Sequence, residues 1–406
     1  MGRGEYPRRF RPCRAEKRQR SFSKTPLAIG HCPGYTFRPM NRRQTACGSP
    51  HDTSDAAPAR RRERVAWLDL FRGAAVLVMI ETHVVNTFLA AGLRDSGAFA
   101  LLNYVNGLVA PSFLFIAGFV QGLERRTSPG TPINYSRRAS RLLGIAALGY
   151  ALHFPVVELA QHRWADALRV GTQFDVLQCL AASLGVLIGL TWLTGKLPRR
   201  RGEAVWWCAV AVLATVAVVA APACAAWTGA PLPLRAFVNQ TTGSLFPLLP
   251  WAGFVFLGAL AGAWPERPLH ERAAGIIGLA WLASICRGAT FAASSPAFFL
   301  ERAAWVLALA ALCEWTARRR LPVWMLFAGR RSLTLYVAHL VLISALVVAG
   351  VPLAALALPW SLALLVVVGA TSLAAAGVPA RLSSFGPLFR PPQSVLGKPH
   401  LLPEPP

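Results

Sequence analysis

Ten apolar segments recur along the chain between residues 65 and 377, separated by short joints rich in Arg, Pro or Gly. Each segment has roughly the 20 residues that a helix needs to cross the hydrocarbon core of a bilayer. They cover residues 67–91, 100–123, 142–160, 174–194, 204–227, 245–264, 273–293, 298–316, 323–349 and 352–376. The division near Gly350 and Pro352 is the weakest in the pattern. The pattern predicts an all-α, polytopic integral membrane protein with about ten transmembrane helices.

Composition supports this prediction and divides the chain into three parts. Of its 406 residues 54% are hydrophobic and 15% are charged, which is too apolar for a water-soluble protein of this length. Residues 65–377 form the predicted membrane domain. Residues 1–64 are rich in Arg, Pro and Ser and predict a disordered tail, either a functional arm or a wrongly extended gene start. They contain no apolar core of a signal peptide. Residues 378–406 predict a Pro-rich tail.

The formal net charge of +24 indicates orientation rather than nucleic-acid binding, because the basic residues alternate between joints. Beyond the N-terminal tail, the Arg-rich joints are residues 125–141, 196–201, 267–272 and 318–320, and the joints between them carry little net charge. Basic joints stay in the cytoplasm. An even number of spans then predicts that both termini are cytoplasmic, and the Ala/Arg-rich composition favours a bacterial inner membrane.

Several kinds of chemistry find no support in the sequence. The eight cysteines show no CxxC spacing and predict packing residues rather than disulfides or metal ligands. The spans contain no Walker A loop, GxGxxG, HExxH or GxSxG motif, which disfavours ATP-driven transport and nicotinamide chemistry. We expect no metal.

The first apolar segment contains an unusual set of polar residues. Helical rotation places Asp69, Arg72, His83 and Asn86 along one stripe, with Glu81 on the opposite side. Ionisable groups inside a span are costly and usually face a protein-lined or watery cavity. The stripe therefore predicts a functional face. Two alternatives remain open: Asp69 and Arg72 pair at the interface, or His83 is only a hydrogen bonder between helices.

The ninth segment carries a second polar stripe. Ser332, Tyr336 and His339 have i, i+4, i+7 spacing, and Arg330 and Arg331 precede them. His339 is expected at nearly the depth of His83, so the two histidines could line one site. A simple interhelical hydrogen bond explains His339 equally well.

Polar residues at the ends of two other segments suggest ligand contacts. Asp175 and Gln178 lie at the external start of the fourth segment and suit a sugar or another hydroxylated ligand, although interfacial solvation also accounts for them. Arg137 and Arg141 have i, i+4 spacing on the cytoplasmic side. They could hold a phosphate or anchor the chain to anionic lipid.

Five sequence pieces together resemble a known family, the catalytic domain of heparan-alpha-glucosaminide N-acetyltransferase, within the multi-span membrane acyltransferases. The resemblance covers residues 65 to about 348. The pieces are LDLFRG (68–73) with His83 downstream, APSFLFIAGF (110–119), FDVLQCL (174–180), LFPLLPWAGF (245–254) and GRRSLTLYVAH (329–339). The sequence differs from the family pattern at Cys179, where a basic residue is expected.

The resemblance implies an enzyme that moves an acyl group, normally acetyl, from cytoplasmic acyl-CoA to a sugar amine or hydroxyl on the external side. It implies a role in the site for His83, Asp69, Arg72, Gln178, Ser332, Tyr336 and His339. His83, His339 and Tyr336 are the predicted catalytic residues. Asp69, Arg72, Asn86, Asp175, Gln178 and Ser332 are predicted to bind substrate. From their charge, Arg137, Arg141, Arg330 and Arg331 are candidates for the CoA phosphates.

Two other classes of function fit the same pattern. A transporter or lipid flippase would use intramembrane His, Arg and Asp residues to bind protons or substrate, although the sequence contains no inverted repeat. A membrane scaffold or sensor would need no turnover. For the enzyme, direct transfer and a covalent acyl-histidine both remain open. The expected partners are acyl-CoA, a glycan or other hydroxyl or amine acceptor, and membrane lipid, but not nucleic acid.

Overall fold

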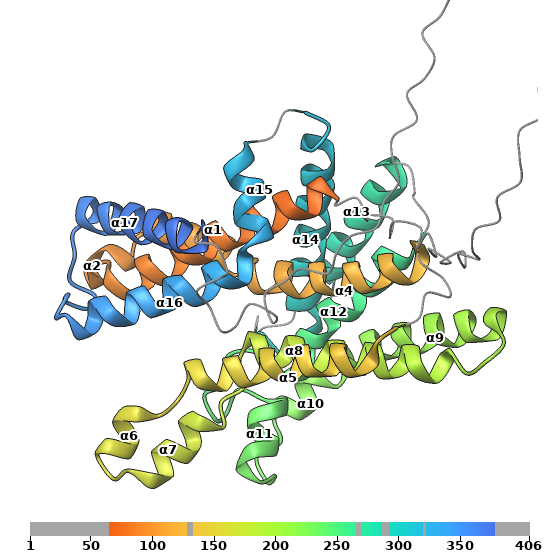
Figure 1. Cartoon of the computed structure of the whole chain (residues 1–406), viewed down its shortest axis with the longest axis horizontal. Coiled ribbons are helices and arrows are strands. Elements are labelled where there is room, and N and C mark those ends of the chain that lie inside the picture. Colours follow the sequence, from red (N-terminus) through yellow and green to blue (C-terminus); the bar gives the residue numbers. More distant parts are fainter. Residues whose placement is uncertain (1–64, 128–132, 265–268, 286–291, 320–321, 378–406) are drawn as a thin grey trace, which may run out of the picture. The chain divides into compact units, whose positions relative to one another are not determined.

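The computed structural model describes residues 65–127, 133–264, 269–285, 292–319 and 322–377, so the predicted tails at 1–64 and 378–406 lie outside the described residues. The described residues form seventeen helices and no β-strand (Figure 1). The helices are α1 (Ala66–Phe88), α2 (Ala91–Arg94), α3 (Gly97–Asn106), α4 (Val109–Thr127), α5 (Tyr135–Leu152), α6 (Val156–Ala160), α7 (Trp164–Gly171), α8 (Val176–Thr194), α9 (Arg199–Val219), α10 (Ala221–Ala225), α11 (Leu232–Val238), α12 (Leu248–Ala263), α13 (Leu269–Ile285), α14 (Pro296–Thr316), α15 (Val323–Arg330), α16 (Ser332–Val348) and α17 (Leu358–Gly377).

Each of the ten predicted segments contains a helix in the part of the chain that the structure describes, and four of them are divided between two helices. The third covers α5 and α6, and the fifth covers α9 and α10. The second is divided into α3 and α4 at Gly107, and the ninth into α15 and α16, which are bent by 83° at Arg331. The weak division near Gly350 is real, because α16 ends at Val348 and α17 begins at Leu358. Five short helices, α2, α6, α7, α10 and α11, occupy the joints at one end.

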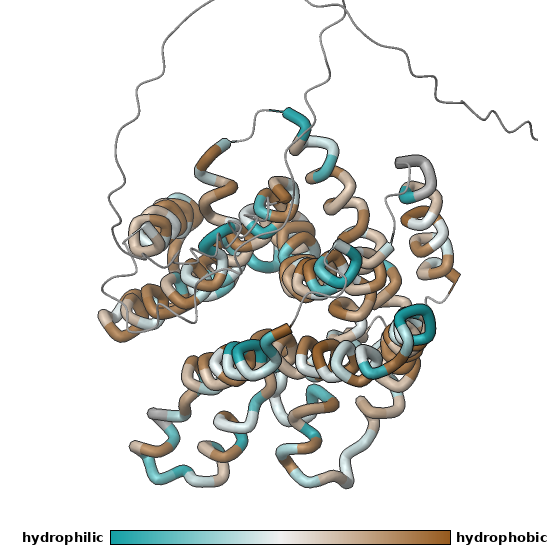
Figure 2. Tube along the Cα trace, turned by 45° about the vertical axis from the view of Figure 1, so that its right-hand side comes forward, coloured by the Kyte–Doolittle hydropathy of each residue, from teal (hydrophilic) through white to brown (hydrophobic). Residues whose placement is uncertain are grey.

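Fewer helices than predicted meet the length and composition of a membrane span. Among the described residues, five do: α3 with α4, α8, α9, α14 and α17, and the bent α15–α16 pair makes six. α1 is long enough, but Asp69, Arg72 and Glu81 reduce its apolar character. α12 is shorter, although every residue type in it is apolar. Hydrophobic residues, brown in Figure 2, run along most of the helices. The chain is thus an all-α membrane protein, while the count of ten spans stays a prediction.

The core of the fold is the contact between α4 and α12, which depends on glycines in both helices. A Cβ atom at Gly118 would lie 1.8 Å from the carbonyl oxygen of Val255, and one at Gly258 would lie 2.0 Å from that of Phe115. Gly122 and Gly262 repeat these contacts one turn further along. Both helices therefore contain a GxxxG pattern, whose missing side chains let the backbones touch.

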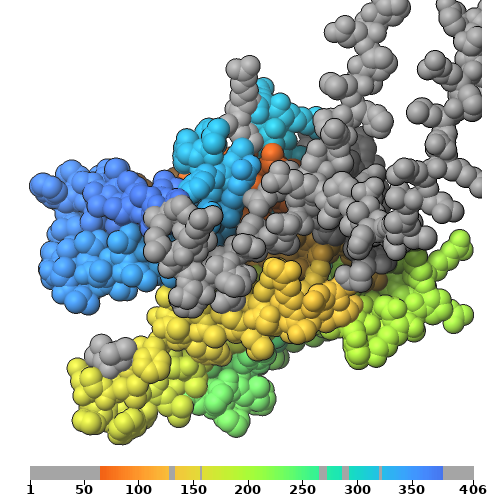
Figure 3. Space-filling model, viewed as in Figure 1, coloured from red at the N-terminus to blue at the C-terminus, as the bar shows by residue number. Residues whose placement is uncertain are grey.

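A second glycine contact fixes α15 against α1. A Cβ atom at Gly73 would lie 2.2 Å from the Met325 carbonyl oxygen, and one at Gly329 would lie 1.8 Å from that of Asp69. α1 also contacts α3, α4, α14, α16 and α17. α16 and α17, both blue in Figure 3, pack side by side. The polar stripe of α1 therefore lies among several helices.

The basic joints meet at one end of the helices, which we call the basic end. The Arg125 guanidinium lies 3.2 Å from the Glu203 carboxylate and so joins the end of α4 to the start of α9. Arg126 donates a 2.7 Å hydrogen bond to the Trp264 carbonyl after α12. Arg272 of α13 pairs with Glu314 of α14. These contacts bring alternate joints together, as an orientation signal requires.

We predict that both termini lie on the cytoplasmic side, with the basic end. Reporter fusions before residue 1 and after Pro406 should both be active only in the cytoplasm, because α17 returns the chain to the basic end. An externally active fusion at Pro406, together with a cytoplasmic one at the N-terminus, would mean an odd number of spans.

Candidate functional site

Two histidines from α1 and α16 lie in contact inside the helical domain. His339 Nε2 is 3.2 Å from His83 Nδ1, and the ring centroids are 5.0 Å apart. His339 has no exposed surface, and His83 is half-buried. An apolar cluster that includes Met79, Leu177 and Leu335 joins α1, α8 and α16, and Tyr336, which contacts the His339 ring, belongs to it. The sequence placed both histidines at similar depth, and the structure brings them together.

Backbone carbonyls assign the tautomer of each ring, because a carbonyl oxygen can only accept a hydrogen bond. His339 Nδ1 lies 2.8 Å from the Leu335 oxygen, and His83 Nδ1 lies 2.9 Å from the Met79 oxygen. Both Nδ1 atoms therefore carry hydrogen in the neutral rings. His83 Nδ1–H is then shared between Met79 and the lone pair of His339 Nε2. The lone pair of His83 Nε2 is left to accept a proton from another molecule.

Asp175 and Tyr336 continue the polar cluster beside the histidines. The Tyr336 hydroxyl donates a 3.4 Å hydrogen bond to Asp175 Oδ2, and its ring lies edge-on to His339 with centroids 5.8 Å apart. Asp175 is the N-cap of α8, where Gln178 Oε1 accepts from its backbone N–H at 3.2 Å. Gln178 Nε2 is buried without a hydrogen-bond partner among the described residues. It is a buried donor that a bound molecule would reach only if neighbouring side chains moved.

His153 belongs to the same cluster, although the sequence analysis did not single it out. It is the C-cap of α5, and its Nε2 lies 3.6 Å from Asp175 Oδ2. The pair becomes a salt bridge when His153 is protonated. One signal in the sequence was available: Pro155 ends the helix just after this histidine, which places His153 at the same membrane depth as the start of α8.

Asp69 and Arg330 pair at the opposite end of α1. Arg330 Nε donates a 3.1 Å hydrogen bond to Asp69 Oδ2, and the Asp69 side chain is 7% exposed. This ion pair joins α1 to α15 beside the Gly329 contact. Arg331 lies at the α15–α16 bend and Ser332 begins α16. The structure therefore places Asp69, Arg330, Arg331 and Ser332 together at the basic end, away from the histidines.

Like Asp69, two further members of the predicted α1 stripe are not brought to the histidine cluster. Asn86 is exposed on α1, one turn beyond His83. Arg72 is half-buried and lies near the basic end, one turn after Asp69. The stripe therefore separates into a basic-end part and a histidine part, and Asn86 is exposed beyond His83.

Three arginines on α5 form a cationic cluster at the basic end. Arg138 pairs with Glu124 and donates a 3.1 Å hydrogen bond to Gln121, while the Arg137 side chain is exposed. Burial and the neighbouring charges of Arg137 and Arg138 lower the pKa of the Arg141 guanidinium. Such mutual repulsion favours binding of an anion. His153 lies twelve residues further along the same helix, about 18 Å at 1.5 Å per residue.

The fold and the cluster define a class of protein: a helical membrane protein with titratable side chains buried where α1, α5, α8 and α16 meet. No group of three or more potential metal ligands is present among the described residues. A family model described as heparan-alpha-glucosaminide N-acetyltransferase, catalytic, matches residues 64–291, more than half of the chain. The chain belongs to this family of membrane acetyltransferases. Comparison with curated proteins and with solved structures gives no match.

The matched region covers only part of the histidine cluster. His83, His153, Asp175 and Gln178 lie inside it, whereas the α16 residues Tyr336 and His339 lie beyond residue 291. The sequence resemblance reached residue 348 through the 329–339 piece. The contact between His83 and His339 joins that piece to the matched region in space. Cys179, which departs from the family pattern, is fully buried in the apolar core.

Proposed function

We propose that the protein is an acyltransferase that moves an acyl group, acetyl in the simplest case, from acyl-CoA to a hydroxyl or amine acceptor. The observation that carries this proposal is the histidine pair, together with family membership. In a membrane interior, a paired imidazole with one available lone pair is suited to general base catalysis. Under this proposal acyl-CoA enters from the cytoplasm and the acceptor from the opposite side.

The reaction begins when the acceptor oxygen or uncharged nitrogen attacks the thioester carbonyl carbon. His83 Nε2 takes the acceptor proton, and the shared Nδ1–H bond to His339 and Met79 holds the ring and stabilises the imidazolium. The carbon–sulfur bond then breaks, and the imidazolium returns its proton to the thiolate. The products are the acylated acceptor and free CoA, and His83 is neutral again.

The neighbouring side chains provide donors for the negative charge on the carbonyl oxygen. Gln178 Nε2 is a buried donor without a partner among the described residues, and a donor of this kind contributes most when it is fixed in advance. The capping box with Asp175 fixes the Gln178 side chain. The Tyr336 hydroxyl is a second candidate, but its one hydrogen is donated to Asp175 here, so it would have to turn from Asp175 to the carbonyl oxygen.

The position of α5 indicates how acyl-CoA, an extended molecule, would bind. The phosphates of acyl-CoA and its thioester lie at opposite ends of a long molecule. The α5 arginines lie at the basic end, and His153 lies at the histidine cluster. Phosphates at Arg137 and Arg141 would therefore leave the acyl arm to follow the helix toward His83. Arg331 at the α15–α16 bend is a further phosphate candidate.

We expect the double variant Arg137→Ala, Arg141→Ala to bind acetyl-CoA at least about 10-fold more weakly, because two charge-assisted contacts are lost. Replacement of both by Lys should restore little of the affinity, since an ammonium cannot bind a phosphate with two parallel hydrogen bonds. Titration with acetyl-CoA in lipid nanodiscs measures both. Arg94→Ala, at the opposite end, is the matched control. Unchanged binding in the double variant would leave lipid anchoring as the role of these arginines.

Release of free CoA distinguishes an acyltransferase from a transporter. Purified protein in proteoliposomes, supplied with acetyl-CoA and an acceptor, should release one free thiol for each acetyl group transferred. A transporter or flippase would move its substrate without forming a thiol. Thiol release measured with a chromogenic disulfide, alongside transfer of labelled acetyl, decides between the two. Transport without thiol release would refute the proposed function.

A further inference from the structure

Three buried polar atoms without a hydrogen-bond partner belong to a single contact between α1 and α3. They are Glu81 Oε1 and both amide atoms of Asn106, Nδ2 and Oδ1. The Glu81 carboxyl lies next to the Asn106 amide, and the two helices are in contact. Asn106 is 7% exposed and Glu81 is half-buried. Polar atoms buried in this way are nearly always paired, so the contact needs an explanation.

The position of Glu81 separates it from the proposed acyl-transfer chemistry. It lies on the side of α1 opposite His83, in the half of the helix nearer Phe88. An ionised carboxylate at such a place in a membrane helix is costly unless a cation lies beside it. In the part of the chain that the structure describes, no basic side chain forms an ion pair with Glu81.

The charged residues of α14 that approach α3 have partners of their own. Arg302 Nη1 donates a 2.7 Å hydrogen bond to the Tyr104 carbonyl oxygen, and the guanidinium carbon lies 4.2 Å from the centroid of the Tyr104 ring. Glu301 accepts a hydrogen bond from the Tyr104 hydroxyl and provides a negative charge near Arg302. A Cβ atom at Gly107 would lie 3.3 Å from the same guanidinium carbon. α14 therefore holds the end of α3, and its cation has a counter-charge other than Glu81.

The other ionisable side chains on the helices that contact α1 lie at the basic end or in the histidine cluster, and α17 has none. They are Glu124, Arg125 and Arg126 of α4, Cys313 and Glu314 of α14, Arg330 of α15, and Tyr336 and His339 of α16. On α1 itself, Asp69 and Arg72 lie near the basic end. The polar neighbour that the structure gives to Glu81 is therefore the neutral Asn106 amide.

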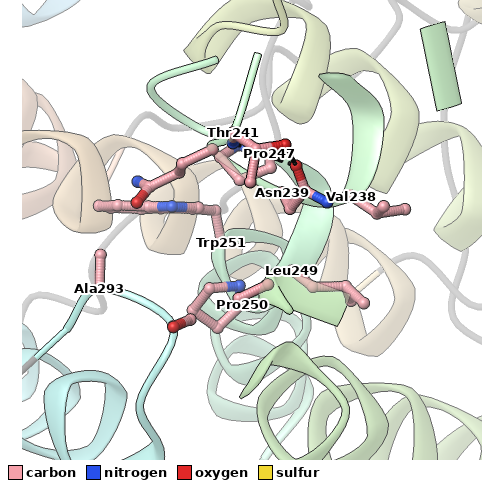
Figure 4. A pocket seen from close by; sticks show the side chains of 11 residues that line it. Val238, Asn239, Thr241, Pro247, Leu249, Pro250, Trp251 and Ala293 are labelled. Atoms are coloured by element: carbon pink, nitrogen blue, oxygen red, sulfur yellow. Dashed lines mark hydrogen bonds between the residues drawn. The ribbon is translucent and has the colours of Figure 1, made fainter. Parts of the chain in front are cut away.

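A cavity of about 330 Å³ at the start of α12 is separate from this contact (Figure 4). Its lining, which includes Asn239, Thr241 and Trp251, contains no ionisable side chain, and neither Glu81 nor Asn106 belongs to it. A molecule in that cavity would not supply the hydrogen bonds that Glu81 and Asn106 lack. The two side chains must supply them to each other.

We propose that Glu81 holds a proton and that the neutral acid forms a pair of hydrogen bonds with Asn106, which joins α1 to α3. The acid O–H donates to Asn106 Oδ1, and the acid carbonyl accepts from Asn106 Nδ2–H. The groups are adjacent, so rotation of the two side chains completes the pair and satisfies all three unpartnered atoms. An ionised carboxylate has no hydrogen to donate, and Asn106 Oδ1 would stay unpartnered. The contact is a proton-binding site outside the acyl-transfer chemistry.

Loss of this proton makes the contact between α1 and α3 dependent on pH. The carboxylate charge then lies in an apolar contact and Asn106 Oδ1 loses its donor, so α3 is held less firmly. After correction for the intrinsic rate, backbone amides of α3 should exchange hydrogen about 2- to 10-fold faster at alkaline than at neutral pH, as expected for the loss of one hydrogen bond. Glu81→Gln retains two hydrogen bonds, amide to amide, at every pH and should show no increase. An equal increase in both proteins would overturn the proton dependence.

Infrared spectroscopy of the full chain near neutral pH detects the proton directly. The protein is kept in an alkyl maltoside detergent, which has no carbonyl group. The C=O band of a protonated carboxylic acid lies above the amide I band, apart from the bands of a carboxylate. Glu81→Gln should remove one acid band and leave the carboxylate bands unchanged. Glu301→Gln, the matched control, should remove a carboxylate band, because Glu301 lies near Arg302. Loss of a carboxylate band in Glu81→Gln would refute the proposal.

Replacement of Asn106 distinguishes the proposed pair from a protonated acid without a partner. In Asn106→Leu the acid carbonyl loses its donor, so the acid band should move to higher frequency. An unchanged band would mean that Asn106 is not the partner. Thermal unfolding adds a second measurement: Glu81→Ala leaves Asn106 unpartnered and should lower the unfolding temperature by about 2 °C or more, whereas Glu81→Gln should not lower it. Equal unfolding temperatures for these two variants would contradict the proposal.

Discussion

Replacement of His83 by Asn should lower acyl transfer by about 10²- to 10⁴-fold, the usual contribution of a general base. The amide retains hydrogen-bonding capacity but cannot carry a proton between acceptor and thiolate near neutral pH. The loss should appear in kcat, with acetyl-CoA affinity and protein abundance unchanged, because His83 is far from the α5 arginines. Single-turnover transfer of labelled acetyl from pre-bound acetyl-CoA measures the chemical step directly.

The His339→Asn variant compares the contributions of the two histidines to acyl transfer. Its Nε2 accepts from His83 Nδ1–H and does not face the acceptor in the assigned tautomers, so its loss should be smaller than that of His83→Asn. Near-normal turnover in His83→Asn would reduce His83 to a hydrogen bonder between helices. A larger loss for His339 than for His83 would reverse their roles. An acetyl label retained on His83 after denaturation would show the covalent route instead of direct transfer.

The largest effect on stability is expected for Gly258→Val in the α4–α12 contact. A Cβ atom at Gly258 would already lie 2.0 Å from the Phe115 carbonyl oxygen, and backbone atoms cannot turn aside as a side chain can. The helices must separate along their whole contact. We expect a loss of about 3 kcal/mol or more in the free energy of unfolding, or no folded protein at all. Thermal unfolding in nanodiscs measures it.

Gly189→Val in α8 is the matched control, because nothing lies within 4 Å of the corresponding Cβ position. There, only the helix propensity of Val against Gly changes, by a few tenths of a kcal/mol. Equal unfolding temperatures for the two variants would mean that α4 and α12 do not approach as closely as their glycines indicate. Gly118→Val should behave like Gly258→Val, since the contacts are reciprocal.

The sequence predicted the positions of the helices well, because apolar length and Arg-rich joints are local signals. Segments 174–194 and 298–316 became α8 and α14 with ends shifted by two residues or fewer. The bend at Arg331 was not predicted. Arg330, Arg331 and Ser332 interrupt the apolar pattern between α15 and α16, but they do not specify an angle, and the bend lies beside the contact of Gly329 with the α1 backbone. That contact involves residues 260 positions apart in the sequence and leaves no local signal.

The candidate site was predicted in part, for a similar reason. Helical spacing placed Tyr336 and His339 on one stripe and His83 on another, but only the fold shows that these stripes meet. Helical spacing also grouped Asp69 with His83 on one stripe. The two residues lie near opposite ends of α1, a helix of 23 residues, and Asp69 pairs with Arg330 instead. His153 was missed because it stands alone in its segment. Its partner, Asp175, comes from another helix.

The bend between α15 and α16 has a mechanical consequence for the histidine pair. α15 is clamped to α1 by Gly73, Gly329 and the ion pair of Asp69 with Arg330, while α16 leaves this clamp at 83°. His339 lies eight residues beyond Arg331, so the segment is a lever arm of about 12 Å. A rotation of about 5° at the bend displaces the His339 ring by about 1 Å, enough to break its contact with His83. The residues that fix α15 against α1 therefore determine the alignment of the two imidazoles as much as the residues that surround the rings do.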